Sequence, residues 1–170
     1  MKLQKMFLSV ATGGLLLGAS GAAMAVDCPS GFIIGQRVAD ITIDGQVCHI
    51  EDTIVDGNVT ITNSPNINMF DVEVQGGVSV TGPAGNTSNT SVVRVDSFGG
   101  NIDVNGHATA IVSACLARGG VDGTGNMTVN NNTGAVVYSN VVFGNLTCTG
   151  NVEADETFNR VYGTENCQAN

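Results

Sequence analysis

Apolar and polar residues alternate in short stretches through the middle of the chain, and each stretch begins with a glycine. After this glycine and its neighbour, apolar side chains occupy every second position, as in a β-strand with one buried face. The stretches are 57–61, 76–80, 100–104, 125–129 and 144–148, so their first glycines are 19, 24, 25 and 19 residues apart. This spacing is typical of solenoids, in which one short unit stacks on the next.

The alternation gives each predicted strand an inner and an outer face. The inward apolar residues are Val59, Ile61, Val78, Val80, Ile102, Val104, Met127, Val129, Leu146 and Cys148. A second inward position is predicted two residues before four of the glycines, at Val55, Val74, Phe98 and Val142. Such short strands bury their apolar faces only when stacked, so the sequence predicts an all-β, single-stranded parallel solenoid of about five to six coils. An immunoglobulin-like sandwich or a calcium-loaded nonapeptide solenoid would show different repeats.

In four of the five repeated stretches the first glycine is followed by an asparagine: Asn58, Asn101, Asn126 and Asn145. Asparagine tolerates turn conformations, and its side chain can bond to the equivalent amide of the next coil. We therefore expect an asparagine ladder at this turn. Two coils also carry insertions, 83–90 and 119–125, which we expect to project as loops. Loops on a rigid scaffold are candidate recognition surfaces.

The first 25 residues read as a secretion signal. Lys2 and Lys5 precede an apolar stretch, and Ala23-Met24-Ala25 fits a cleavage site, which would leave Val26 at the mature N-terminus. A lipoprotein signal would need a small residue where Asp27 precedes Cys28. We expect a secreted, periplasmic or cell-surface protein without a transmembrane segment.

The predicted organisation of the chain has four parts. A signal peptide covers 1–25, an N-terminal cap with the first coil covers 26–56, further coils cover 57–150, and a C-terminal cap segment covers 151–170. Without the signal, four arginines face fifteen acidic residues and no lysine, so the net charge is −11. This balance argues against nucleic acid or an anionic membrane as a partner.

Five cysteines in an exported chain indicate two disulfides and one free thiol. Terminal coils lack a neighbour on one side, so position along the chain favours bridges at both ends, Cys28 with Cys48 and Cys148 with Cys167. Cys115 would then be a buried free thiol in the core. No metal or cofactor is expected, because His49 and His107 are isolated and no Cys-x-x-Cys spacing occurs.

Three motifs suggest a family. Gly-x-x-Cys occurs at 45–48 before the coils with their Gly-Asn-Val pattern, and the chain closes with Gly-Asn-Leu-Thr-Cys at 144–148, Asn-Arg-Val-Tyr-Gly at 159–163 and Cys167. From Gly45 onward the chain resembles small exported bacterial right-handed parallel β-helix proteins, although Arg160 and Tyr162 replace small polar residues usual in that signature. The resemblance implies a right-handed β-helix and export. It implies no activity, since none is assigned to that family.

Enzymatic activity is not expected. Parallel β-helix lyases and glycosidases use clustered carboxylates, whereas the acids here are scattered. Asp71, Glu73 and Asp103 lie on predicted outer faces without an evident acid–base partner, and the tightest acidic group, 153–156, lies in the predicted cap.

The outward positions form two expected files of small polar residues. Stacking would align Thr60, Thr62, Ser79, Thr81, Thr128, Thr147 and Thr149 on one face, interrupted by Asp103, Asn105 and Asn130. Such files occur in ice-binding solenoids, but threonine is also favoured on any solvated strand.

Two broader hypotheses remain. The chain is either a structural or adhesive surface component that self-associates through its sheet edges, or a monomeric module that binds a glycan or another surface ligand through its loops. Disulfide-capped ends would argue against open-ended stacking.

Overall fold

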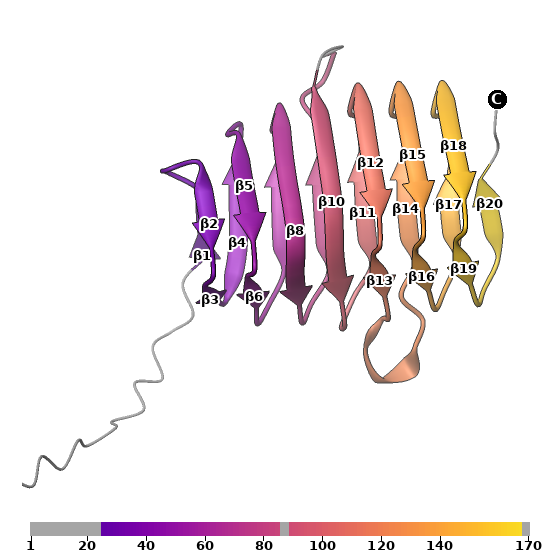
Figure 1. The fold of residues 1–170 in the computed structure, drawn as a ribbon, viewed down its shortest axis with the longest axis horizontal. Helices are drawn as coiled ribbons and strands as arrows, with labels where there is room; N and C mark the ends of the chain where they lie inside the picture. The colour runs from indigo at the N-terminus through magenta and orange to yellow at the C-terminus, as the bar shows by residue number, and fades with distance from the viewer. Residues whose placement is uncertain (1–24, 86–88, 168–170) are drawn as a thin grey trace, which may run out of the picture.

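The computed structural model describes residues 25–85 and 89–167, and within them the chain is almost entirely β. Two parallel sheets face each other, as in a β-sandwich or a solenoid, and the chain passes from one sheet to the other in coil after coil (Figure 1). The predicted signal peptide, apart from Ala25, lies outside the described residues.

Sheet A contains one strand from each coil, all paired in parallel. Its strands are β1 (Ala25–Val26), β4 (Asp40–Asp44), β7 (Val59–Thr62), β9 (Val78–Thr81), β11 (Ile102–Asn105), β14 (Met127–Asn130), β17 (Leu146–Cys148) and β20 (Glu165–Cys167). The repeated Gly-led stretches of the sequence form β7, β9, β11, β14 and β17.

Sheet B takes the second half of each coil, and most of its strands are divided by a bend. Its strands are β2 (Phe32–Ile34) and β3 (Arg37–Val38), β5 (Cys48–Glu51) and β6 (Ile54–Val55), β8 (Asn66–Val74), β10 (Thr90–Ser97), β12 (Thr109–Ser113) and β13 (Leu116–Ala117), β15 (Gly134–Tyr138) and β16 (Val141–Val142), and β18 (Glu153–Thr157) and β19 (Arg160–Val161). A short 3-10 helix, η1 (Gly120–Asp122), lies in the loop that connects β13 of sheet B to β14 of sheet A.

The described chain has more coils than predicted. We call a sheet A strand and the sheet B strands that follow it a coil; seven coils run along the stack, and β20 begins an eighth (Figure 1). The prediction of five to six was wrong because the first two coils lack the Gly-Asn start on which it relied. The predicted C-terminal cap segment also continues both sheets through β18, β19 and β20.

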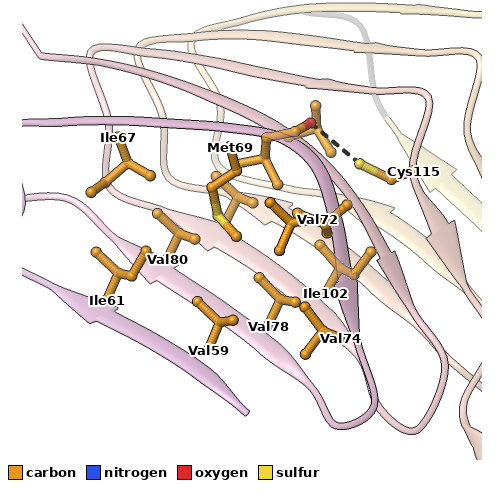
Figure 2. Close-up of a cluster of buried hydrophobic side chains, with 14 of the residues drawn as sticks. Val59, Ile61, Ile67, Met69, Val72, Val74, Val78, Val80, Ile102 and Cys115 are labelled. Carbon is orange, nitrogen blue, oxygen red and sulfur yellow. Dashed lines mark hydrogen bonds between the residues drawn. The ribbon is translucent and has the colours of Figure 1, made fainter. Parts of the chain in front are cut away.

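The core lies between the two sheets, where inward side chains from each coil stack on those of the next. All ten residues predicted to face inward from sheet A are at most 2% exposed. Figure 2 shows Val59, Ile61, Val78 and Val80 of this sheet opposite residues of β8 such as Met69. The period-two alternation therefore predicted this face correctly.

Phe98 was wrongly predicted to face inward. It is half-buried, and Ser97 takes the inward position, paired with Val74 on one side and Ala117 on the other. β10 has one residue fewer than its neighbours where they bend, which shifts its register between Val93 and Val95. This shift moves the following phenylalanine out of the core.

The structure forms both disulfides that position along the chain predicted. Cys28 is bonded to Cys48 and Cys148 to Cys167. Each bridge joins a terminal coil to the adjacent coil from within the stack. Disulfides are typical of proteins that fold in an oxidising compartment.

Cys115 is the free thiol, 2% exposed, at the bend between β12 and β13 (Figure 2). Its Sγ–H donates to the Val93 carbonyl at 3.3 Å. Burial raises the pKa of this thiol to about 12. Cys115 is therefore a core residue and not a reactive nucleophile.

The predicted asparagine ladder is present on the surface, and we call it the surface ladder. Asn58 Oδ1 accepts from Gly77 N at 2.9 Å, Asn101 Oδ1 from Asn126 N at 2.9 Å, and Asn126 Oδ1 from Asn145 N at 2.8 Å. Asp40 begins it, with its Oδ1 accepting from Asn58 N at 2.7 Å. The ladder is interrupted where Gly77 supplies no side chain.

A second set of asparagines, not predicted, forms what we call the inner ladders. At the turn after sheet A, Asn132 Oδ1 accepts from His107 N at 2.8 Å and Asn151 Oδ1 from Asn132 N at 2.9 Å. At the bend of sheet B, Asn140 Oδ1 accepts from Cys115 N at 2.9 Å. Asn159 Oδ1 in turn accepts from Asn140 N at 3.0 Å.

Candidate functional site

The bend of sheet B creates a depression on its outer face. In six coils the bend contains a residue with positive φ, namely Gly35, Asp52, Asp71, Ala114, Ser139 and Phe158. β10 has no such residue, because its register is one residue short at this point. Around this shortened strand lies a hollow of about 310 Å³, lined by Asp71, Val72, Glu73, Arg94, Val95, Asp96 and Ala114.

Arg94 is the cation of this depression. Its guanidinium carbon lies 5.3 Å from the centroid of the Phe70 ring, and its Nε donates to Ser113 Oγ at 3.2 Å. The ring and the hydroxyl hold the guanidinium over the outer face of the sheet, a cation–π arrangement. The remaining N–H groups of Arg94 are donors that a ligand could use.

Asp96 is the carboxyl whose ionisation the site perturbs. It pairs in register with Glu73 of β8 and Leu116 of β13. Burial raises the pKa of Asp96, and the negative charges of Glu73 and Asp71 raise it further, while the backbone N–H of Leu116 partly opposes them. The depression therefore combines a carboxyl of raised pKa with two other acids and one arginine.

Aromatic rings continue this surface toward the N-terminal end. Phe32 and His49 lie edge to face with ring centroids 6.0 Å apart, and His49 and Phe70 are 5.6 Å apart. His49 Nε2 lies 3.0 Å from Glu51 Oε2. Phe32 is 60% exposed. The outer face of sheet B thus presents a row of rings beside the polar depression.

The sequence-predicted acids separate in the structure. Asp71 and Glu73 come together with Asp96, which sequence reasoning missed, whereas Asp103 lies on sheet A. The nearest signal for Asp96 is its spacing of 23 residues from Glu73, one short of the 24 residues that separate Gly76 from Gly100 in the same two coils. Arg94 gave no such signal, since the shortened bend that places it over Phe70 is invisible in the pattern.

The outward polar files follow the stack on sheet A. Pairing aligns Thr60, Ser79, Asp103, Thr128 and Thr147 in one file. In the other file, pairing aligns Thr81, Asn105 and Asn130. At one end of this file, Thr149 Oγ1 donates to Asn130 Oδ1 at 3.1 Å. At the other end, Thr62 Oγ1 donates to Asp44 Oδ1 at 2.9 Å. Asparagine and aspartate thus break the threonine surface, and ice binding stays a prediction.

The two insertions are only partly described. Loop 119–125 projects from the stack and carries η1, with Val121 fully exposed (Figure 1). Loop 83–90 includes residues 86–88, which lie outside the described residues. At its end, Asn89 is buried, and its Nδ2 lies 3.1 Å from His107 Nδ1. A role of the two insertions in recognition stays a prediction.

Within residues 25–85 and 89–167, no helix is long and apolar enough to cross a bilayer. In the same residues no three or more His, Cys, Asp or Glu side chains are grouped to hold a metal ion. No protein-family model matches the chain, and neither the curated proteins nor the solved structures contain a significant match. The resemblance to exported bacterial β-helix proteins therefore rests on the residues of this chain.

Proposed function

We propose that the protein is an exported, non-enzymatic right-handed β-helix that serves as a structural or adhesive component of the cell surface and associates end to end. The observation that supports this is the state of its two ends. β1, β2 and β3 at one end, and β18, β19 and β20 at the other, each pair with only one strand in the described part of the chain.

Unpaired edges of parallel sheets are templates for further strands. The disulfides do not change this, because they tie the terminal coils to their neighbours from the inside and leave the outer backbone edge free. The expectation that capped ends oppose stacking assumed that the caps cover the backbone edge of the terminal strands, whereas these disulfides lie inside the stack. Sheet A keeps its register along the stack, and the terminal strands of sheet B are in register with their neighbours, so a second copy could continue both sheets.

Edge prolines provide the test. Arg160 N and Tyr162 N donate inward to the preceding coil, so the N–H of Val161 between them points to the free edge. By the same alternation the N–H of Ile34 points away from β5, since Gly35 N donates to Glu51 O. Val161→Pro and Ile34→Pro each remove one edge donor at opposite ends, and each keeps the backbone hydrogen bonds that the neighbouring residues make to the adjacent coil.

We expect sedimentation velocity of oxidised residues 26–170 to show concentration-dependent growth for the wild type and monomers for each proline variant. Mixing the two variants, each with one intact end, should give dimers and nothing longer. Formation of this mixed dimer also shows that both variants are folded. A wild type that stays monomeric over the whole concentration and pH range would overturn the proposal.

A monomeric glycan-binding module is the second candidate, supported by the outer face of sheet B. Aromatic rings pack against the apolar faces of sugars, and arginine and carboxyl groups bond to their hydroxyls. Arg94→Ala should abolish binding on a glycan array. Arg118→Ala, which removes an exposed arginine of the loop region, is the matched control.

A further inference from the structure

Two inward files of side chains are apolar in every coil until the last. From sheet A, one file contains Ile41, Val59, Val78, Ile102, Met127, Leu146 and finally Glu165. From sheet B, the other contains Ile33, Ile50, Met69, Val93, Val112, Val137 and finally Glu156. A carboxyl thus replaces an aliphatic side chain at the core register of each sheet, at the same end of the molecule.

These two carboxyls lie at the open end of the stack, close enough for the charge of Glu165 to act on Glu156. Both stand at the core register of the last strands, where Glu156 is half-buried and Glu165 is exposed, and Asn159 Nδ2 donates to Glu156 Oε1 at 3.2 Å. Burial, and then the neighbouring carboxyl of Glu165, raise the pKa of Glu156 to about 7.

Among the residues that the structure describes, no cation stands beside the pair at this register of the packed strands. β15 presents the uncharged Val137 at this register, and β17 presents Leu146. The other acids of β18, Glu153 and Asp155, are exposed at the alternate positions of the strand. At the core register of this end, the charge is therefore carried by the two glutamates alone among the described residues.

The two ends of the stack are complementary halves of one coil. β20 begins an eighth coil in sheet A, with no sheet B strand after it in the described residues. At the other end, β2 and β3 are a complete sheet B half, while β1 has two residues, one of them before the predicted cleavage site. β2 and β3 of a second copy would complete the coil that β20 begins, and β20 would lie beside the second copy's β4 in place of β1 (Figure 1).

We infer that the C-terminal end docks on the N-terminal end of a second copy of the chain, and that Glu156 and Glu165 act as a proton-controlled lock on this contact. The inference rests on the proposed end-to-end association and specifies its direction and regulation. Continuing the register places Glu156 against Ile33 and Glu165 against Ile41 of the second copy. An ionised carboxylate against an aliphatic side chain has no partner, so docking requires the proton held by Glu156.

The outer side of the same contact contributes little. The register places Arg160 opposite the second copy's Arg37, and both side chains are exposed. Arg160 lies over the Tyr162 ring and Arg37 pairs with Asp56 at 2.6 Å. Exposed like charges that already have partners repel weakly in water and salt.

Sedimentation velocity of oxidised residues 26–170 at pH 5, 7 and 8 tests the lock. If docking requires the proton held by Glu156, the association constant should fall by about tenfold for each pH unit above 7. The double variant Glu156→Gln and Glu165→Gln, which keeps the hydrogen-bonding shape without charge, should associate at pH 8 as strongly as the wild type does at pH 5. The matched control is Glu153→Gln with Asp155→Asn, which removes the same number of charges from exposed positions of β18.

The outcomes separate the two proposals. Association that is equal at pH 5 and pH 8, or a control variant that associates at pH 8 as well as the glutamine double variant, would overturn the lock and leave end-to-end association standing. If neither the wild type nor the glutamine double variant associates at any of these pH values, end-to-end association itself is wrong. Circular dichroism on the same samples shows that the variants keep their β structure.

Discussion

The surface ladder and the inner ladders use the same residue for the same bond in different surroundings. Asn126 of the surface ladder is half-buried, and its oxygen accepts one backbone N–H. Asn140 of the inner ladders is 1% exposed, and its Nδ2 also donates to the Val112 carbonyl at 3.0 Å and to Asn159 Oδ1 at 2.9 Å. Water can replace the hydrogen bond of Asn126 but not those of Asn140. Burial, and not residue type, therefore decides how much each asparagine contributes to the free energy of unfolding.

Asn140→Ala should have the largest effect on stability. It leaves the buried Cys115 N–H without an acceptor, removes a donor to the Val112 carbonyl, and empties part of the bend. We expect the free energy of unfolding to fall by about 2–4 kcal/mol. Urea unfolding of the oxidised protein at pH 8, at low concentration, measures this change.

Asn126→Ala is the matched control in the surface ladder. It frees only Asn145 N–H, whose exposed residue lets water take the bond. We expect a loss of about 0.5–1 kcal/mol. Equal losses for the two variants would contradict the claim that burial separates the two kinds of ladder.

The sequence could predict the surface ladder but not the inner ones. Asn58, Asn101, Asn126 and Asn145 follow a glycine at a fixed place in the repeated stretch, so their alignment is visible in the pattern. Asn132 lies in a polar run, 130–133, that is typical of any loop, and Asn140 is one of two polar residues, with Ser139, in a short break between apolar stretches. Their burial depends on how each coil bends, which alternation does not encode.

The same limit applies to the charged residues. Alternation predicted which aliphatic residues face inward, because every coil repeats them. Glu156 breaks the repeat and stands in an acidic run, so the sequence grouped it with Glu153 and Asp155, although its side chain lies at the core register of Val137. Arg94 and Asp96 meet Glu73 because β10 is one residue short, and a missing residue is recognisable only in the register of the paired strands.

His107 extends the comparison to a buried group that titrates. It stands at the inner-ladder turn, 1% exposed, and its Nδ1 lies 3.1 Å from Asn89 Nδ2 and from Ser91 Oγ. Burial lowers the pKa of His107. Below about pH 6.5 the histidine is protonated in the unfolded chain but stays neutral in the folded chain. The free energy of unfolding therefore falls as pH decreases, by at most about 1.4 kcal/mol per pH unit.

The difference between the wild type and His107→Gln in urea unfolding at pH 8, 7, 6 and 5 measures this contribution. We expect the wild type to lose more stability than the variant as pH falls below 6.5. The subtraction is needed because Glu156 acts in the opposite direction: its raised pKa makes stability fall as pH rises from about 4.5 to about 7. Parallel pH profiles for the two proteins would mean that His107 binds its proton equally well in the folded and unfolded chains, which would contradict the lowered pKa.

The smallest expected effect comes from repairing the gap in the surface ladder. Gly77 has no positive φ, and a Cβ built on it would lie 3.4 Å from Asn101 O and 3.6 Å from Asn101 N, close to ordinary contact. A hollow of about 230 Å³, lined in part by Asn58 and Asn101, leaves room for the side chain. Gly77→Asn should therefore supply an acceptor for the next coil and raise the free energy of unfolding by about 0.5–1 kcal/mol.

Gly76→Asn is the control, because its Cβ would lie 2.6 Å from Gly57 O, so that variant should be destabilised. If Gly77→Asn also destabilises the protein, the gap is required by the packing of these two coils and the surface ladder is not limited by its missing side chain.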